Sequence, residues 1–406
     1  MANVSSSNGL EKRPKLRFPG FDDPYRTITL GQIASLVNRT DPTSNAPIMM
    51  LSAGNGFIMQ SEKYSRDNAG QSLKKYILLK KGELAYNHGA SKAKQYGCCY
   101  ELTENEARIP YVYHCFKISG TEHTPYVATA LNNPKIDRQL KRLVSSSVRM
   151  DGLLNISFDD YMSVILHLPS LKEQTHIADF LKKLDERITA QEKLVASLKK
   201  YKRGVMQSIF RHSTQEGWKT VKLGEIFKKV SRRNTNGDIK NVITNSAEYG
   251  LIPQRDFFDK DIAVDGNTSN YYVIEEGDFV YNPRKSNTAP YGPFNRYTLK
   301  EKGIISPLYT CLVLQEDINP AYLAWYFKSD AWYRYIYDNG SQGVRHDRVS
   351  MTDDLLMGIP VSVPTVSKQK KVAEILDAVE YRLSAAQGEY DTLVKLKNGF
   401  MQQLFI

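Results

Sequence analysis

Two polar stretches of this chain carry side chains whose chemistry suits contact with a nucleic acid. Each follows a tyrosine, Tyr86 or Tyr281, and they read NHGASKAKQYG and NPRKSNTAPYG. Arg and Lys can donate to guanine O6 and N7, Asn can bond adenine in two places, and Lys and Ser can hold phosphates. The candidate contacts are Asn87, His88, Ser91, Lys92, Lys94, Asn282, Arg284, Lys285, Ser286 and Asn287. For any one of them a solvated loop position is the alternative, so the repetition of the set is the stronger evidence.

A second matched pair of candidate contacts lies further along each half of the chain. Arg149 stands beside Ser147, and Arg345 stands near Gln342. We include Arg149, Gln342 and Arg345 among the candidate DNA-binding residues. A structural salt bridge explains the two arginines equally well.

The sequence carries no recognisable motif for catalysis. It has no G-x-x-x-x-G-K-[ST] phosphate loop and no G-x-G-x-x-G turn for a nucleotide or methyl-donor cofactor. Its seven histidines are dispersed, and its four cysteines, at 98, 99, 115 and 311, lack the spacing of a metal site. We expect no catalytic centre, metal or cofactor in this chain.

Composition agrees with a polyanionic partner. The 406 residues carry a net charge of +11, with the apolar (41%) and charged (24%) fractions of an ordinary globular protein. The N-terminal residues lack the apolar core of a secretory signal, and neither long helix described below has 18 uninterrupted apolar residues. We expect a soluble, cytoplasmic protein with reduced thiols and no membrane contact.

The elements that must position the polar stretches occur twice. A helix predicted from Pro169 to about Phe210 has a seam with a 3.5-residue period, which favours packing against another long helix. Its members are Leu184, Ile188, Gln191, Val195, Leu198, Lys202, Val205 and Ile209. The seam returns 195 residues later, at Val379, Leu383, Ala386, Tyr390, Leu393, Lys397, Phe400 and Leu404. The chain is therefore an internal duplication.

Other residues keep the same offset, among them Pro169 and Pro364, and Gln174 and Gln369. Since each seam can pack on its own copy, we predict that the two helices pair antiparallel. At ~1.5 Å per residue each is roughly 50 to 60 Å long. Lys202 and Lys397 should then reach solvent or a carboxylate. The alternative is that each helix lies separately on its own domain.

The segments between the helices also match. Leu30–Ile33 corresponds to Leu223–Ile226 as a short helix start, and strands are predicted at Tyr76–Leu79, Tyr271–Ile274 and Thr310–Leu314. No βαβ alternation long enough for a doubly wound sheet occurs. We predict an α+β chain with two duplicated mixed α/β modules and two long helices. The expected parts are a tail (1–24), module 1 (25–168), a central helix (169–212), module 2 (213–363) and a distal helix (364–406).

These residues together resemble the specificity subunit of a type I restriction–modification system. The resemblance rests on KLRFPGF, the Leu-Gly-x-Ile openings, KGELAYNHG, EGDFVYNPRKSN, the IISPLY run and the two P-x-x-x-x-Q…G-x-M-Q helices, and it covers nearly the whole chain. It implies two target-recognition domains, each reading one half of a split, asymmetric site in double-stranded DNA. They would be held apart by antiparallel helices in a pseudo-two-fold molecule.

The resemblance also implies the partners. Two modification subunits would methylate adenine with S-adenosylmethionine, and restriction subunits would cleave and translocate DNA with ATP and Mg²⁺, while this chain is not catalytic. One departure matters: the first module has His88 and Gly89 where the second has Pro283 and Arg284. The reading set of one module therefore does not transfer to the other.

Two alternatives remain open at this point. One is a scaffold without DNA, in which the duplicated modules bind protein partners along a coiled-coil strut. The other is a self-sufficient nuclease, which the missing motifs disfavour. The salt dependence of DNA binding separates the first alternative, because phosphate contacts weaken steeply as salt rises.

Overall fold

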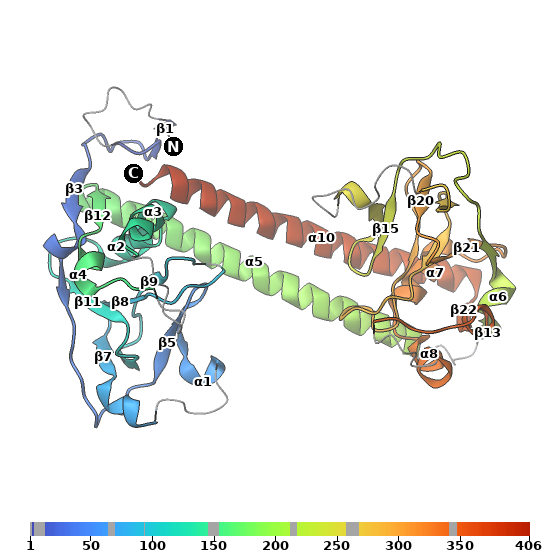
Figure 1. The fold of residues 1–406 in the computed structure, drawn as a ribbon, viewed down its shortest axis with the longest axis horizontal. Helices are drawn as coiled ribbons and strands as arrows, with labels where there is room; N and C mark the ends of the chain where they lie inside the picture. The colour runs from blue at the N-terminus through green and yellow to red at the C-terminus, as the bar shows by residue number, and fades with distance from the viewer. Residues whose placement is uncertain are drawn as a thin grey trace. The chain divides into compact units, whose positions relative to one another are not determined.

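The computed structural model describes residues 2–3, 13–63, 70–92, 94–144, 154–211, 217–256, 268–340 and 347–406 (Figure 1). The chain forms two compact units. We call Met1–Glu192 together with Gly388–Ile406 the first unit, and Lys193–Gln387 the second unit. Each long helix contributes one half to each unit.

The two predicted helices are α5 (Leu171–Arg211) and α10 (Val366–Gln403). Each begins two residues after a proline, Pro169 or Pro364, and the residue just before the helix is Ser170 or Thr365, types that are favoured at that position. The first helical hydrogen bonds join Gln174 N to Ser170 O and Gln369 N to Thr365 O, each at 2.9 Å.

The repeated glutamines have a structural reason. Gln174 Nε2 donates to Pro169 O at 3.0 Å, and its Oε1 accepts from His123 N at 2.9 Å. Gln369 donates in the same way to Pro364 O, at 2.9 Å, and accepts from Asn319 N, at 2.8 Å. Each buried amide thus joins the start of a long helix to the start of a short helix of the same unit, α2 (Thr124–Leu131) or α7 (Pro320–Lys328).

The antiparallel pairing of α5 and α10 is confirmed. In the first unit Phe180 contacts Phe400, with ring centroids 5.1 Å apart, and Arg187 pairs with Glu389 at 2.8 Å, so rising numbers on α5 meet falling numbers on α10. In the second unit Lys202 pairs with Glu380 at 2.6 Å. All predicted seam residues are buried or partly buried, most completely Val195, Val379, Ala386, Leu393 and Leu404.

The first unit is built from antiparallel strand pairs. Its central sheet has the order β4-β11-β8-β9. The strands of this sheet are β4 (Ala34–Leu36), β11 (His114–Ile118), β8 (Leu84–Asn87) and β9 (Cys98–Glu101). The paired strands around it are β1 (Ala2–Asn3) with β2 (Leu16–Arg17), β3 (Arg26–Thr29) with β12 (Ile165–Leu168), β5 (Met49–Ser52) with β6 (Gly56–Met59), and β7 (Ile77–Lys80) with β10 (Glu106–Ile109). The short helices are η1 (Leu30–Gln32), α1 (Gln60–Lys63), η2 (Gly70–Lys75), α2 (Thr124–Leu131), α3 (Pro134–Leu143) and α4 (Phe158–Met162).

The second unit repeats this topology. Its central sheet has the order β14-β21-β18-β19. These strands are β14 (Phe227–Val230), β21 (Thr310–Leu314), β18 (Phe279–Tyr281) and β19 (Phe294–Arg296). The surrounding pairs are β13 (Trp218–Lys222) with β22 (Pro360–Pro364), β15 (Ile243–Ser246) with β16 (Gly250–Pro253), and β17 (Tyr272–Ile274) with β20 (Gly303–Ile305). The short helices are α6 (Leu223–Ile226), η3 (Gln254–Asp256), α7 (Pro320–Lys328), α8 (Tyr333–Asn339) and α9 (Asp353–Met357).

Each central sheet separates two cores, because successive side chains of a strand point to opposite faces. On β8, Leu84 and Tyr86 join the core under α2, α3 and α4, while Ala85 joins the core on the other face. On β18, Phe279 and Tyr281 likewise join the core on one face, and Val280 joins the core on the other face. Both strands end at the predicted polar stretches, so a packed sheet fixes where each stretch begins.

Candidate nucleic-acid interface

The two polar stretches form the same loop. We call residues 87–97 loop 1, of which residue 93 lies outside the described residues, and residues 282–292 loop 2. Asn87 Oδ1 accepts from Gly89 N at 2.9 Å, and Asn282 Oδ1 accepts from Arg284 N at 3.0 Å. Ser91 Oγ accepts from Lys94 N at 3.0 Å, and its counterpart Ser286 accepts from Ala289 N at 3.1 Å. The loops thus share their internal hydrogen bonds although most of their side chains differ.

A tyrosine and a glycine close each loop. Tyr86 donates its hydroxyl to Tyr96 O at 2.7 Å, and Tyr281 donates to Tyr291 O at 2.9 Å. Gly97 and Gly292 have φ of 82° and 85°, which a glycine adopts without strain. A Cβ at either glycine would collide with the carbonyl oxygen of the asparagine that opens the loop. Only glycine fits there.

The structure divides the candidate residues of loop 1 into outward and inward side chains. Ser91 and Lys92 are exposed. His88 is buried, with Nδ1 2.8 Å from Leu154 O and Nε2 2.8 Å from Val112 O, so its ring links three segments of the first unit. Lys94 donates to Asn132 O at 2.8 Å, and burial lowers the pKa of its ammonium group. Lys92 therefore stays the clearest candidate contact of this loop, while His88 and Lys94 hold it in place.

Loop 2 places more of its candidates outward. The Arg284 side chain is 67% exposed, with Nε 3.7 Å from Asp347 Oδ2, and Ser286 and Asn287 are exposed as well. Lys285 is partly buried, and its backbone N donates to Asp347 O at 2.9 Å. Asn282 is buried, and its amide donates to Asn245 O at 3.3 Å.

The second matched set of candidates falls on residues that the structure does not describe. Arg149, Gln342 and Arg345 all lie outside the described residues. The described segments that follow them are tied to the loops, since Leu154 N donates to His88 O and Val349 N donates to Pro283 O, each at 2.9 Å.

Sequence reasoning missed a hollow of about 320 Å³ beside loop 2. One wall is the hairpin β15–β16 with its turn, and the opposite wall is loop 2. The lining residues are Thr244, Asn245, Ser246, Ala247, Glu248, Asn282, Arg284, Lys285, Ser286, Thr288, Pro293 and Tyr309. Burial raises the pKa of the Tyr309 hydroxyl, so this side chain is a neutral donor at physiological pH. The hairpin residues carried no sequence signal, because only the packing of β15–β16 brings them to loop 2.

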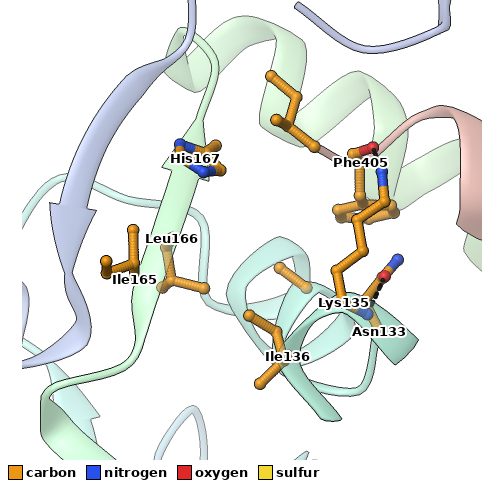
Figure 2. Close-up of a pocket in the computed structure, with 9 residues that line it drawn as sticks. Asn133, Lys135, Ile136, Ile165, Leu166, His167 and Phe405 are labelled. Atoms are coloured by element: carbon orange, nitrogen blue, oxygen red, sulfur yellow. Dashed lines mark hydrogen bonds between the residues drawn. The ribbon is translucent and has the colours of Figure 1, made fainter. Parts of the chain in front are cut away.

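A second hollow, in the first unit, is much smaller. It has a volume of about 20 Å³, room for roughly one water molecule, and lies between α3, β12 and the chain after α10. Figure 2 shows Lys135 on α3 reaching toward Phe405, with Asn133 just before α3 and Leu166 and His167 on β12. Lys135 Nζ donates to Phe405 O, and Asn133 Nδ2 donates to Met401 O, each at 2.6 Å. These bonds satisfy carbonyl groups at the end of α10, so the polar side chains around this hollow have a structural role.

The described residues were also compared with the requirements of a membrane span, a metal site and a reactive thiol. Among them, no helix is both long and apolar enough to cross a membrane. No group of three or more His, Cys, Asp or Glu side chains is arranged there to hold a metal ion. Cys98, Cys99, Cys115 and Cys311 are buried free thiols, and burial raises the pKa of Cys98 to about 11.

Comparison with known proteins agrees with this geometry. A family model described as the type I restriction modification DNA specificity domain matches residues 215–393, which include loop 2 and the β15–β16 hairpin. The S subunit of a Type-I restriction-modification system from M. genitalium is similar over 97% of this chain and 99% of its own, at 14% identity and a TM-score of 0.57. A chain from a structure on the assembly and conformational transition of the type I R-M system is similar over 96% and 98%, at 16% identity and a TM-score of 0.53. Residues 215–393 therefore match the type I restriction modification DNA specificity domain, and the chain has the fold of the S subunit from M. genitalium.

Proposed function

We propose that this chain is the DNA-binding specificity subunit of a type I restriction–modification complex, and that each unit reads one half of a bipartite, asymmetric site. The observation that carries the proposal is the equivalence of loops 1 and 2. They share their hydrogen bonds but present Gly89 and Lys92 in one unit against Arg284 and Asn287 in the other. One scaffold with two sets of exposed donors is suited to two different half-sites.

The side chains of loop 2 suit two different roles, which are to read bases and to hold phosphates. Arg284 can donate in two places to guanine O6 and N7, and Asn287 can pair with adenine N6 and N7. Lys285 and Ser286 can hold phosphates and so fix the register without reading sequence. In loop 1 the same reasoning leaves Lys92 as the charged contact. The net charge of +11 favours association with DNA by either unit.

The long helices have two proposed roles, which are to set the spacer between the half-sites and to dock two modification subunits. Tyr201 on α5 and Leu396 on α10 are exposed apolar side chains 195 residues apart. A matched apolar residue on each helix suits two copies of one partner. In this proposal the chain is not catalytic. The modification partners bring S-adenosylmethionine, and the restriction partners bring ATP and Mg²⁺.

The test is DNA binding by the purified chain, with its modification subunits, over a series of salt concentrations. We expect log Kd to change linearly with log salt, with a slope of about 0.9 for each phosphate contacted. Mapping of methylated adenines in cells with and without this chain should then reveal one bipartite motif. If the chain and the modification subunits associate at every salt concentration but do not bind DNA, the protein-binding scaffold is favoured instead.

A further inference from the structure

The β15–β16 hairpin is fixed against loop 2 by buried amides. Asn245 Nδ2 donates to Val280 O at 2.9 Å, and Asn282 Nδ2 donates to Asn245 O at 3.3 Å. Asn295 Nδ2 donates to Asn245 Oδ1 at 2.7 Å and to Ser246 O at 3.0 Å. All three asparagines are buried, so breaking this network would leave unpaired polar groups. The hairpin and loop 2 therefore present their side chains at a set spacing.

The turn of this hairpin carries a carboxylate. Glu248 is exposed and lines the hollow opposite Arg284 and Lys285. Its backbone N donates to Ser246 Oγ at 3.2 Å, and Tyr249 N donates to the same oxygen at 3.2 Å, so the turn is locally ordered. With the rest of the described chain, the Glu248 carboxylate forms no hydrogen bond or ion pair.

A carboxylate at this position conflicts with phosphate binding. Next to a DNA backbone it would be repelled, and it offers no donor to a phosphate oxygen. The groups on DNA that can donate to it in the major groove are the exocyclic amino groups, cytosine N4 and adenine N6. Arg284, on the facing wall, suits the acceptors of a guanine in the same groove. The two walls of the hollow therefore offer opposite hydrogen-bonding characters.

We propose that Glu248 is a specificity-determining residue of the second unit, accepting a hydrogen bond from the exocyclic amino group of a cytosine or adenine next to the base that Arg284 contacts. The first unit differs at this position. Its equivalent hairpin, β5–β6, turns through Ala53, Gly54 and Asn55, without an acidic side chain. The acidic contact thus belongs to one half-site only.

This inference rests on the proposed function, and its test uses the full chain with its modification subunits and a pool of randomised DNA. The variants are Glu248→Ala and Glu248→Gln. The control is Glu316→Ala, which removes the same charge from an exposed position. Glu316 follows the C-terminal end of β21, whereas Tyr309, which lines the hollow, precedes the N-terminal end. Glu316→Ala should gain less affinity for unrelated DNA than Glu248→Ala, because salt screens the effect of a charge that lies further from the DNA.

Glu248→Ala should relax the preference at one position of one half-site by roughly 5- to 150-fold, the range for one lost base contact. Glu248→Gln should favour adenine over cytosine there, since an amide suits both adenine N6 and N7. Glu316→Ala should leave the motif unchanged. If folded Glu248→Ala selects the wild-type motif at every position, the inference is wrong. A wild-type chain that selects no motif would instead overturn the proposed function.

Discussion

Lys397 on α10 donates a hydrogen bond to the carboxylate of Asp185 on α5. Its duplicate is the pair of Lys202 and Glu380, in which each residue stands 195 positions from its counterpart. Both lysines interrupt an otherwise mostly apolar seam, and the prediction that they reach a carboxylate or solvent is confirmed. Because all four side chains are partly exposed, each pair should contribute at most about 1 kcal/mol. The apolar seam must stabilise the pairing.

Truncating the seam should therefore destabilise the protein much more than truncating the helix surface. The Leu393 side chain lies in the seam and is 8% exposed, whereas Leu396, one turn further on, is 47% exposed. We expect Leu393→Ala to lower the free energy of unfolding by about 2 to 5 kcal/mol, through lost burial and a cavity. Leu396→Ala should change it by less than about 1 kcal/mol. Urea unfolding measures both.

Leu198, on α5, gives a second point on the same scale. It is only partly buried, so Leu198→Ala should fall between the two α10 variants. Equal losses at Leu393 and Leu396 would show that the buried seam does not stabilise the helix pair.

The sequence predicted the helices, their seam and the duplication because these depend on local periodicity and on repetition. It also placed Asn87 and Asn282 at corresponding positions. It did not predict that these asparagines fold the loop instead of facing outward. That role depends on a hydrogen bond to a backbone N two residues on, which any solvated Asn could also make.

The inward positions of His88 and Lys94 had no local signal either. Their partners, Leu154, Val112 and Asn132, are distant in sequence and meet them only through the sheet and α2. Glu248 was missed for the same reason. Charge and residue type suggested which stretches could bind DNA, while tertiary packing decided which side chains remain available.

Closing glycines should be essential to the loops. Gly292→Ala adds a Cβ that collides with Asn282 O at a positive φ of 85°. Gly277→Ala is the matched control, since its φ is 97° but nothing lies within 4 Å of the added Cβ. We expect Gly277→Ala to cost about 1 to 3 kcal/mol of stability from backbone strain alone. Gly292→Ala should cost more and should weaken reading of the second unit's half-site. If the two variants have the same free energy of unfolding and select the same DNA site, the steric explanation is contradicted.

Substitutions in the two loops should act on different half-sites. Arg284→Ala should relax one base position of the half-site read by the second unit, at about 1 to 3 kcal/mol for a lost bidentate contact. Lys92→Ala should weaken the other half-site. Arg334→Ala is a control, because it removes an exposed arginine that pairs with Asp338 along α8. Site selection from randomised DNA measures all three. A single loop substitution that alters both half-sites equally would exclude independent reading.

The first unit should lose stability as pH falls below about 6.5. His114 Nε2 donates to Ile156 O at 2.9 Å, and the ring faces Tyr86, His88, Phe158 and Tyr161. Burial lowers the pKa of His114, and the neighbouring His88 acts in the same direction while Ile156 O opposes them. The unfolded chain, with a histidine pKa of about 6.5, then binds the proton more readily. Stability is present above that pH and is lost as the pH falls toward the folded pKa.

His114→Gln should therefore flatten the pH dependence. When the pH is lowered from 7.5 to 5.5, we expect the urea midpoint of the wild-type protein to decrease, and the urea midpoint of the variant to decrease less. An identical slope in the His114 variant would assign the acid sensitivity to other groups.

The last prediction concerns the proposed role of the helices in setting the spacer between the half-sites. α5 is one continuous helix of 41 residues, about 60 Å at 1.5 Å per residue. Removing four residues from it between Gln191 and Lys202, and four from the matching positions of α10, shortens each helix by about 6 Å. Four residues are close to one turn, so the seam residues on both sides of the deletion stay nearly in line. Removing only two residues from each helix turns the seams apart and is the control that should not pair.

If the helices set the spacing, the four-residue variant should methylate a motif whose half-sites are unchanged but whose spacer is about two base pairs shorter, at roughly 3.4 Å per base pair. Two base pairs also rotate the duplex by roughly 70°, given about 10.5 base pairs per turn, so some affinity should be lost. Mapping of methylated adenines with the modification subunits present measures the spacer and both half-sites together. A folded, active four-residue variant with the original spacer would show that the distance between half-sites is set elsewhere.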